Sequence, residues 1–448
     1  MQQDSSKQRF SAFWIVGVLV AAFLSFSPYR KVMPGPSPGE LLVLIMAPMV
    51  AVRFVLLPSR KAPNLFALGL VALVLLYMGA LLQTTQHGLS FDIFKMPLQW
   101  TLHAVVFCGV YLWLVDDIGR RLPLLERGLV MMAVACGLLC CLQMLLGPLP
   151  SISLMPWGPS WTEWYSRWGF RTYGFFDNPL LAGVILTMIW PLALHRAFAG
   201  TRAAKPACFI ILLGVVLTGS RSCVLVLFLL TLIQMAPRLK VSGQLIMATG
   251  AMAGFVLIIL SPMGERFRTL VANGGDENLT HRVVAVEAGF AMINDQPLTG
   301  IGPGLFADAY AHHYKPILSQ DDPSAYTLDN TLFQMTAETG LPFGAVCLVM
   351  FGYLMALVVF FDNSKGRPLA FMMLAYGLLS LMVALYATPV MWLLMVIFAM
   401  IEARYNALNA NGRHAGDGAL EYRDSKGFHR KMATSTSTFF GDSGHKTP

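Results

Sequence analysis

Charged residues are scarce along the whole of this chain. Of its 448 residues only 12% are Asp, Glu, Lys or Arg, whereas 56% are hydrophobic, and the mean hydropathy is +0.61. A soluble enzyme with a single membrane anchor is not apolar over its whole length. The composition therefore predicts an all-α polytopic membrane protein.

The sequence also lacks the usual marks of a signal peptide, a metal centre or a dinucleotide site. The apolar run over residues 11–27 has no convincing small-residue cleavage site, so we interpret it as a retained first span. Seven cysteines lie in or beside apolar runs without ligand spacing, which indicates small core residues. GIGPG, residues 300–304, follows no predicted strand and so does not indicate nucleotide binding. We expect no cofactor and no metal.

Basic residues set the expected topology. The net charge of +8 lies largely in short loops between apolar runs, where it reports membrane orientation and gives no reason to expect nucleic acid as a partner. About 12 transmembrane helices follow, with both ends of the chain in the cytoplasm. They are expected near residues 11–27, 40–57, 65–82, 97–115, 129–146, 180–198, 207–235 (counted as two), 244–260, 341–361, 369–386 and 390–402.

The run over residues 207–235 is too long for one span, since roughly 30 residues at 1.5 Å each give about 45 Å. One tilted helix with a buried arginine and two short helices are both compatible with its length. Two helices place most basic loop groups on one side of the membrane, so we predict a hairpin with Arg221 at its outer tip.

One long polar interruption divides the apolar runs. We expect residues 1–261 to form the N-terminal membrane helices, 262–340 a periplasmic loop, 341–402 the C-terminal helices and 403–448 a disordered cytoplasmic tail. Within the loop, residues 281–293 have the pattern of an amphipathic helix, and GIGPG forms a tight turn. A polar face on a membrane body is the expected place for chemistry.

Several residues of these outer segments have a functional and a structural interpretation. Arg221 and Arg282 suit phosphate oxygens, but an ion pair with Glu287, Asp329 or Glu338 is the alternative. His312 and His313 could bind a metal or act as a base, and the alternative is that they are only solvated. Asp329 and Asn330 open a short helix, so Asp329 is a helix cap or a base. The glycines of GIGPG permit a turn or the approach of a ligand.

Four motifs follow one another on the predicted outer side: RTYGFFDNPLLAG (171–183), TGSRS (218–222), HRVVAVEAGFAMINDQPLTGIGPGLF (281–306) and DNTLFQMTAETGLPFG (329–344). In this order they resemble the O-antigen ligase and polymerase superfamily of bacterial envelopes, which transfers glycans from a polyprenyl diphosphate carrier. The resemblance covers roughly residues 171–361 and implies a metal-independent glycosyltransferase of the inner membrane with a periplasmic active face. Its partners would be a polyprenyl diphosphate-linked glycan, membrane lipid, a flippase and chain-length or export proteins.

The resemblance also implies roles for residues. Arg221 and Arg282 would hold the diphosphate, with Asp329 as the base, and the catalytic set is therefore Asp329, Arg221 and Arg282. The substrate-binding set would be Ser220, Asn330, Gly302, Gly304, His313 and Arg171.

Asp329 stands where the ligases have a histidine. A carboxylate can act as a base but offers no positive charge to a diphosphate. The sequence therefore favours a polymerase of exopolysaccharide or O-antigen repeats. A ligase acting on lipid A core, a transporter of polysaccharide or lipid-linked sugar, and a structural partner of an export machine remain the alternatives.

Overall fold

The computed structural model describes residues 38–56, 63–87, 91–146, 171–176, 178–238, 277–314, 330–360, 367–383, 385 and 390–408. Throughout these ranges the regular elements are helices, as the apolar composition predicts. Contacts divide the chain into a unit over Met1–Ala403 and a second over Arg404–Pro448. Apart from the end of the last described helix, which runs to Leu408, the elements discussed below belong to the first unit.

Five helices are long and apolar enough to cross a membrane, judged by length and composition: Leu65–Thr85, Ile93–Asp116, Ile118–Leu146, Pro179–Phe198 and Val390–Leu408. They lie in α3 (Leu65–His87), α4 (Phe91–Asp116), α5 (Ile118–Leu146), α7 (Pro179–Phe198) and the last described helix. Four shorter apolar segments belong to α2 (Pro38–Val55), α8 (Ala204–Leu217), α9 (Arg221–Met235) and α15 (Leu341–Phe360). The membrane character is thus confirmed, whereas the total of about 12 spans stays a prediction. The expected spans at 11–27 and 244–260 lie outside the described residues.

The predicted interruption of residues 207–235 is confirmed. Helix α8 ends at Leu217 and α9 begins at Arg221, with Thr218, Gly219 and Ser220 between them, a segment we call the break. Gly219 has a φ of +64°, a conformation that glycine adopts without a steric penalty. With 14 and 15 residues, α8 and α9 are each about 21–22 Å long, less than the hydrocarbon thickness of roughly 30 Å.

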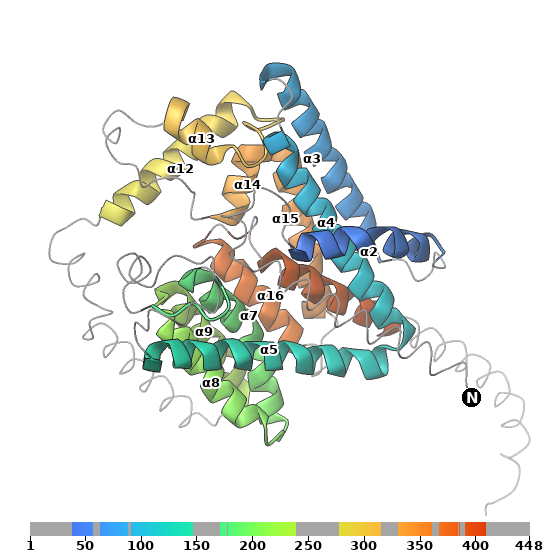
Figure 1. Ribbon diagram of the computed structural model, residues 1–448, viewed down its shortest axis with the longest axis vertical. Helices are drawn as coiled ribbons and strands as arrows, with labels where there is room; N and C mark the ends of the chain where they lie inside the picture. The colour runs from blue at the N-terminus through green and yellow to red at the C-terminus, as the bar shows by residue number, and fades with distance from the viewer. Residues whose placement is uncertain are drawn as a thin grey trace, which may run out of the picture. The chain divides into compact units, whose positions relative to one another are not determined.

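Helix α7 lies among its neighbours on every side. All its residues from Leu181 to Leu194 are buried, and it packs against α5, α8, α9 and α16 (Arg367–Ser380), as Figure 1 shows. A helix that is apolar all round belongs inside a bundle. At its start Asn178 accepts a hydrogen bond from the Leu180 amide at 2.8 Å, and Pro179 occupies the first helical position.

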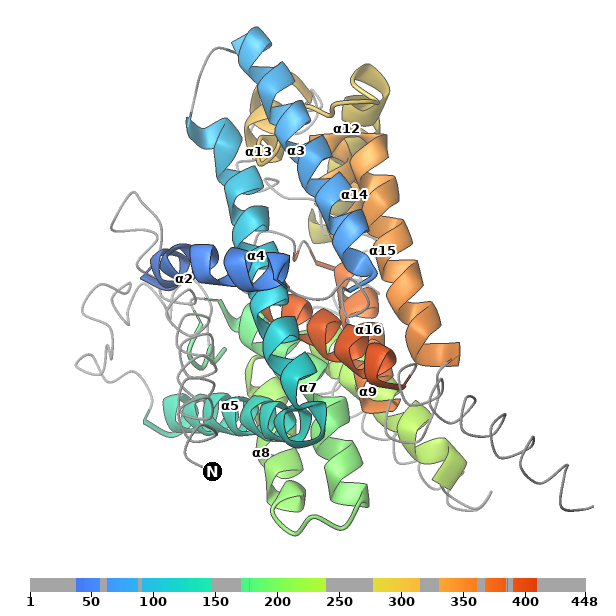
Figure 2. The same cartoon turned by 90° about the vertical axis from the view of Figure 1, so that its right-hand side faces the viewer.

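The polar interruption forms short helices that pack on one another. They are α12 (Glu277–Asp295), α13 (Phe306–Ala309), the π-helical turn η5 (Tyr310–Tyr314) and α14 (Thr331–Thr339). Helix α12 contacts α14 and η5, and α14 runs into α15, which packs against α3 (Figure 2). The expected helix over 281–293 and the short helix after Asn330 are both confirmed. Ala288, Met292, Ile301, Phe306, Tyr310 and Ala337 form the buried core of this part.

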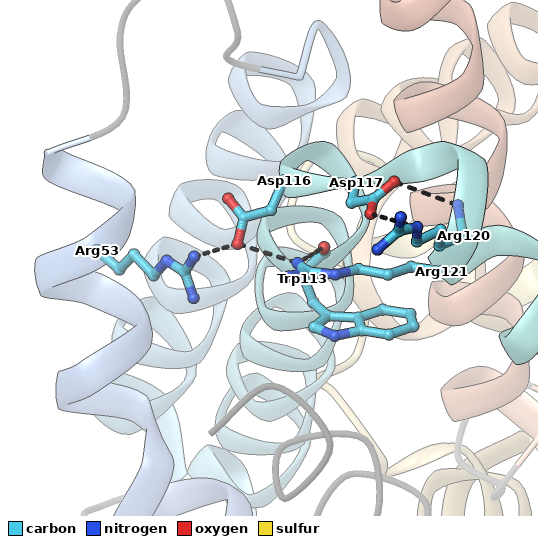
Figure 3. Close-up of polar contacts among 6 residues, drawn as sticks. All are labelled: Arg53, Trp113, Asp116, Asp117, Arg120 and Arg121. Carbon is cyan, nitrogen blue, oxygen red and sulfur yellow. Dashed lines mark hydrogen bonds and ion pairs between the residues drawn. The ribbon is translucent and has the colours of Figure 1, made fainter. Parts of the chain in front are cut away.

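A charged corner joins α4 and α5, as Figure 3 shows. Asp116 pairs with Arg53 of α2 and, at 3.0 Å, with Arg121, whose guanidinium lies 5.4 Å from the centre of the Trp113 ring. The Asp117 carboxylate accepts a hydrogen bond from the Arg120 amide at 3.2 Å and so caps α5. The expected spans over 97–115 and 129–146 put Arg120 and Arg121 in the loop between them, but Asp117 alone separates the two helices and both arginines lie in α5.

Candidate functional site

Two of the four motifs meet at the break. The Arg171 guanidinium donates from Nη2 to the carbonyl oxygen of Gly219 at 2.8 Å, and the Thr172 amide donates to the Leu217 carbonyl oxygen at 3.1 Å. Carbonyl groups at the end of α8 lack partners within the helix, and this segment supplies them. Arg171, predicted to bind substrate, is thereby fixed beside the break while its side chain stays exposed.

Small residues allow this approach. A Cβ atom on Gly183 of α7 would lie 2.9 Å from the Cys223 sulfur and 3.0 Å from the Thr218 hydroxyl oxygen. A Cβ atom on Gly219 would lie 3.1 Å from both Cγ and Nε of Arg171. The glycines of two motifs thus let α7, the break and Arg171 pack tightly together.

Arg221 and Ser220 lie at the start of α9. Arg221 is its first residue and is half-buried, while Ser220 is 3% exposed. The Ser220 side chain does not cap the helix, and its hydroxyl lies 3.4 Å from that of Ser222. The first amide groups of a helix carry partial positive charge, so this end of α9 favours an anion. Arg171, Arg221 and the start of α9 are called the arginine group below.

The other two motifs meet at GIGPG, called the glycine loop. Its amide groups donate to protein oxygens: Gly300 to Gln296 O at 2.9 Å, Ile301 to Ala337 O at 3.1 Å, Gly302 to Glu338 O at 2.9 Å and Gly304 to a Glu338 carboxylate oxygen at 2.9 Å. Pro303 has no amide hydrogen to donate. With φ of +64°, +117° and +79° at Gly300, Gly302 and Gly304, the glycines serve the turn. This geometry favours the turn over an amide cradle for a ligand; substrate binding by Gly302 and Gly304 stays a prediction.

Two buried side chains hold the glycine loop. Glu338 of α14 is 1% exposed and accepts from Gln334 Nε2 at 3.0 Å as well as from the Gly304 amide. Gln83 of α3, also 1% exposed, donates to the Gly300 carbonyl oxygen at 2.9 Å and to Gln296 Oε1 at 3.2 Å. The loop is therefore bound both to α14 and to a long membrane helix.

Asn330 caps α14. Its side chain accepts from the Phe333 amide at 2.9 Å, and its backbone is extended, as at a typical N-cap. We considered a capping role for Asp329, and the next residue fills it. Asp329 itself lies outside the described residues. Thr331, the first residue of α14, donates to Val383 O and accepts from the Leu385 amide at 2.8 Å, just beyond α16.

The remaining predicted residues lie on α12 and η5. Arg282 is in α12, and its side chain is outside the part of the chain that the structure describes. His313 is exposed in η5, with its ring 6.3 Å from that of His312, which lies 3.3 Å from the Asp308 carboxylate. The Tyr314 hydroxyl donates to Asp295 at 2.8 Å and so joins η5 to the end of α12.

Helix α16 links the two halves of the site. It packs against α7 and α9 of the arginine group and against α15, which continues from α14. The four motifs thus assemble as two pairs on one scaffold.

Comparison with known families agrees with this assembly. A model of the family described as O-antigen ligase matches residues 206–349. The matched residues include the break, the glycine loop and α14, and the match confirms the resemblance to the O-antigen ligase and polymerase superfamily. The match does not separate ligase from polymerase and lends no support to a transporter. A search of curated proteins gives no match.

Sequence reasoning missed two residues and undervalued a third. Gln83 and Gln143 are lone amides within apolar helices, and Glu338 was weighed only as an ion-pair partner. Polar side chains at membrane depth are costly and therefore informative. The same argument that singled out Arg221 therefore also applies to the glutamines within apolar helices.

Proposed function

We propose that this protein is a polymerase of lipid-linked polysaccharide repeat units, of exopolysaccharide or O-antigen, that transfers a glycan from polyprenyl diphosphate to an acceptor hydroxyl. The observation that carries the proposal is the arginine group, in which Arg171 and Arg221 lie beside the start of one helix within or next to the O-antigen ligase segment. Guanidinium groups and helix amides both favour phosphate oxygens.

The reaction is a single displacement. The acceptor hydroxyl attacks the anomeric carbon, the bond from that carbon to the diphosphate oxygen breaks, and the diphosphate leaves with the electron pair. Asp329 takes the hydroxyl proton, and Arg221 with Arg282 stabilises the negative charge of the leaving diphosphate. One displacement inverts the anomeric centre.

The other predicted residues would bind substrate around these three. Arg171 and Ser220 lie by the break, where they would contact the diphosphate, and His313 is exposed on η5, where a glycan can reach it. Asn330, Gly302 and Gly304 would act mainly by shaping the neighbouring turn and helix start. We place the protein in a bacterial inner membrane with this face on the periplasmic side, supplied by a flippase and followed by chain-length or export proteins.

A ligase that transfers the glycan to lipid A core is the second candidate, favoured by the description of the matched family. The carboxylate at Asp329 instead of the ligase histidine favours the polymerase. The two differ in acceptor: the polymerase extends a carrier-linked chain, whereas the ligase needs lipid A core.

The test uses the purified protein in liposomes with a polyprenyl diphosphate-linked oligosaccharide, and products are sized by gel and mass spectrometry. A ladder of repeats is expected. A single product formed only with added lipid A core would identify a ligase, and no covalent product from a verified substrate would overturn both.

Variants then test the arginine group. We expect Arg221→Ala to lower turnover by about 10²- to 10³-fold, because a preorganised donor to the leaving charge is lost, and Asp329→Asn to remove the base. Arg120→Ala is the matched control, since Arg120 is an exposed arginine at the start of α5. Full activity of Arg221→Ala would overturn the role of the arginine group.

A further inference from the structure

One face of α5 forms a seat for the segment that carries Arg171. Cys136, Cys140 and Gln143 lie four and three residues apart, a spacing that puts them on the same side of the helix. A Cβ atom on Gly174 would lie 2.5 Å from the Cys136 sulfur and 3.4 Å from the Cys140 sulfur. Gly174 has a φ of +57°, so both its conformation and its surroundings require glycine.

Gln143 makes three hydrogen bonds to this segment. Its Oε1 accepts from the Tyr173 amide at 3.1 Å and from the Gly174 amide at 3.0 Å, and its Nε2 donates to the Gly174 carbonyl oxygen at 3.0 Å. One side-chain amide therefore satisfies a turn whose backbone groups have no helix or sheet to pair with.

A continuous set of contacts runs from Gln143 to the arginine group. Gln143 fixes Tyr173 and Gly174, the neighbouring Thr172 amide donates to Leu217 at the end of α8, and Arg171 donates to Gly219. Arg221 begins α9 two residues after Gly219. Helix α5 lies outside the matched family segment, yet through Gln143 it holds the turn that follows Arg171.

We propose that Gln143 is a positioning residue that holds Arg171 against the break and thereby completes the diphosphate site. The inference rests on the proposed function. Gln143 touches no substrate; it acts through the backbone of Tyr173 and Gly174. A glutamine placed only to fill the bundle would stabilise the helices without affecting how Arg171 contributes to turnover.

The decisive experiment is a double-mutant cycle in the liposome assay. We expect Gln143→Leu to lower kcat/KM by about tenfold in the wild-type background, and to have no further effect in an Arg171→Ala background, because coupled residues are not additive. Gln143→Glu keeps both acceptor contacts and should recover part of the loss. Equal losses in both backgrounds would overturn the inference and indicate a structural role.

Gln234→Leu provides the matched control. Gln234 is a 6% exposed glutamine in α9, and within the described residues its amide atoms have no hydrogen-bond partner. The same change there should leave kcat/KM unaltered. Wild-type-like turnover of Gln143→Leu would overturn the inference.

A second readout does not depend on turnover. Hydrogen exchange at the Tyr173 and Gly174 amides should become at least tenfold faster in Gln143→Leu and stay unchanged in Gln234→Leu. Unchanged exchange would overturn the inference. An inactive wild-type protein with accelerated exchange in Gln143→Leu would instead overturn the proposed function, and with it the diphosphate role of Arg171, while leaving the contact itself established.

Discussion

Around the break, the Arg171 guanidinium donates to Gly219, Arg221 is the first residue of α9, and the segment bearing Arg171 is held by a neutral amide, Gln143. Around the glycine loop, a buried carboxylate from Glu338 accepts from a loop amide, and the other amides donate to backbone oxygens. The first region keeps its positive groups at a helix end that the Ser220 side chain does not cap. In the second region, the amide groups of the glycine loop donate to oxygens of the protein itself.

This difference in how donors are used indicates that the break is the binding surface and that the glycine loop is part of the scaffold. A glycine loop with its amides directed at an anion is a familiar phosphate site, but here one loop amide donates to the Glu338 carboxyl group and the others to backbone oxygens. Glu338 lies where a ligand phosphate would otherwise be expected. The arginine group is therefore the better candidate for contact with diphosphate, and the glycine loop for shaping the outer helices around it.

The largest effect on stability should come from removing the buried carboxyl group of Glu338. Glu338→Ala leaves the Gly304 amide and the Gln334 side chain without this buried acceptor, which should cost about 3 kcal/mol of unfolding free energy. Glu338→Gln keeps an acceptor oxygen and should cost about half as much. Thermal unfolding in detergent measures both changes.

Glu287→Ala is the control, because Glu287 is an exposed carboxylate of the neighbouring α12. It should unfold as the wild type does. If Glu338→Ala unfolded like the wild type but bound a diphosphate lipid more tightly, the glycine loop would be the binding surface and the comparison would be reversed.

The next largest loss of stability is expected from replacing two glycines that have a positive φ, Gly174 and Gly304. Gly174→Ala should cost about 2–3 kcal/mol, because the left-handed conformation is unfavourable for alanine and the new methyl group meets the Cys136 sulfur. Gly304→Ala should cost only the conformational part, about 1–2 kcal/mol, since nothing lies within 4 Å of its added Cβ.

Adding Cys136→Ala should recover part of the loss in Gly174→Ala and none in Gly304→Ala. Unfolding temperatures of the four variants test this. Equal losses of stability for the two glycine variants would show that α5 can accommodate a methyl group at residue 174 without a steric cost from the Cys136 sulfur.

The smallest effect concerns the Tyr314–Asp295 hydrogen bond. Partial burial, and then the bond to Asp295, raise the pKa of Tyr314 to about 12, so the hydroxyl keeps its proton at neutral pH. Tyr314→Phe should cost roughly 0.5–1 kcal/mol. Because the folded-state pKa exceeds the unfolded value near 10, this stability is fully present below pH 10 and is lost as the pH rises towards 12.

The difference in unfolding temperature between wild type and Tyr314→Phe, followed from pH 8 to 11, measures this prediction. A difference that grows with pH would contradict it. Ala311→Gly is the control, because Ala311 is an exposed residue of η5 and its replacement reports general fraying of the turn without changing the Tyr314 hydroxyl. Phe306 lies in the same core but is buried and has no hydroxyl, so it does not serve as a control.

Much of the architecture was predictable because apolar runs and helix signals are local. The helix over 281–293 and the short helix after Asn330 follow from patterns within about 20 residues, whereas the interruption near Gly219 follows from the length of its apolar run and from the basic loops along the chain. The start of α5 was not predicted, because Arg120 and Arg121 read as loop charges until Asp117 is seen to cap the helix.

The site was only partly predictable, because its pairings are long-range. Nothing in the sequence joins Gln143 to Gly174 or Gln83 to Gly300, 217 residues away. The glycine loop could not be assigned to turn or ligand until its amide partners were located on α14. Single-chain patterns identify which groups are unusual, whereas only the folded arrangement identifies what each one faces.

Helix α5 can also be regarded as a strut. It has 29 residues and is therefore about 43 Å long. At one end it is fixed by the charged corner of Asp116, Asp117 and Arg121, and near the other Gln143 grips the turn that carries Arg171. A hydrogen-bonded helix moves largely as a rigid body. A change in its orientation at the charged corner would therefore also move Gln143 and the turn that carries Arg171. The ion pair of Arg53 with Asp116 fixes α2 to this corner, at the end of α5 opposite Gln143.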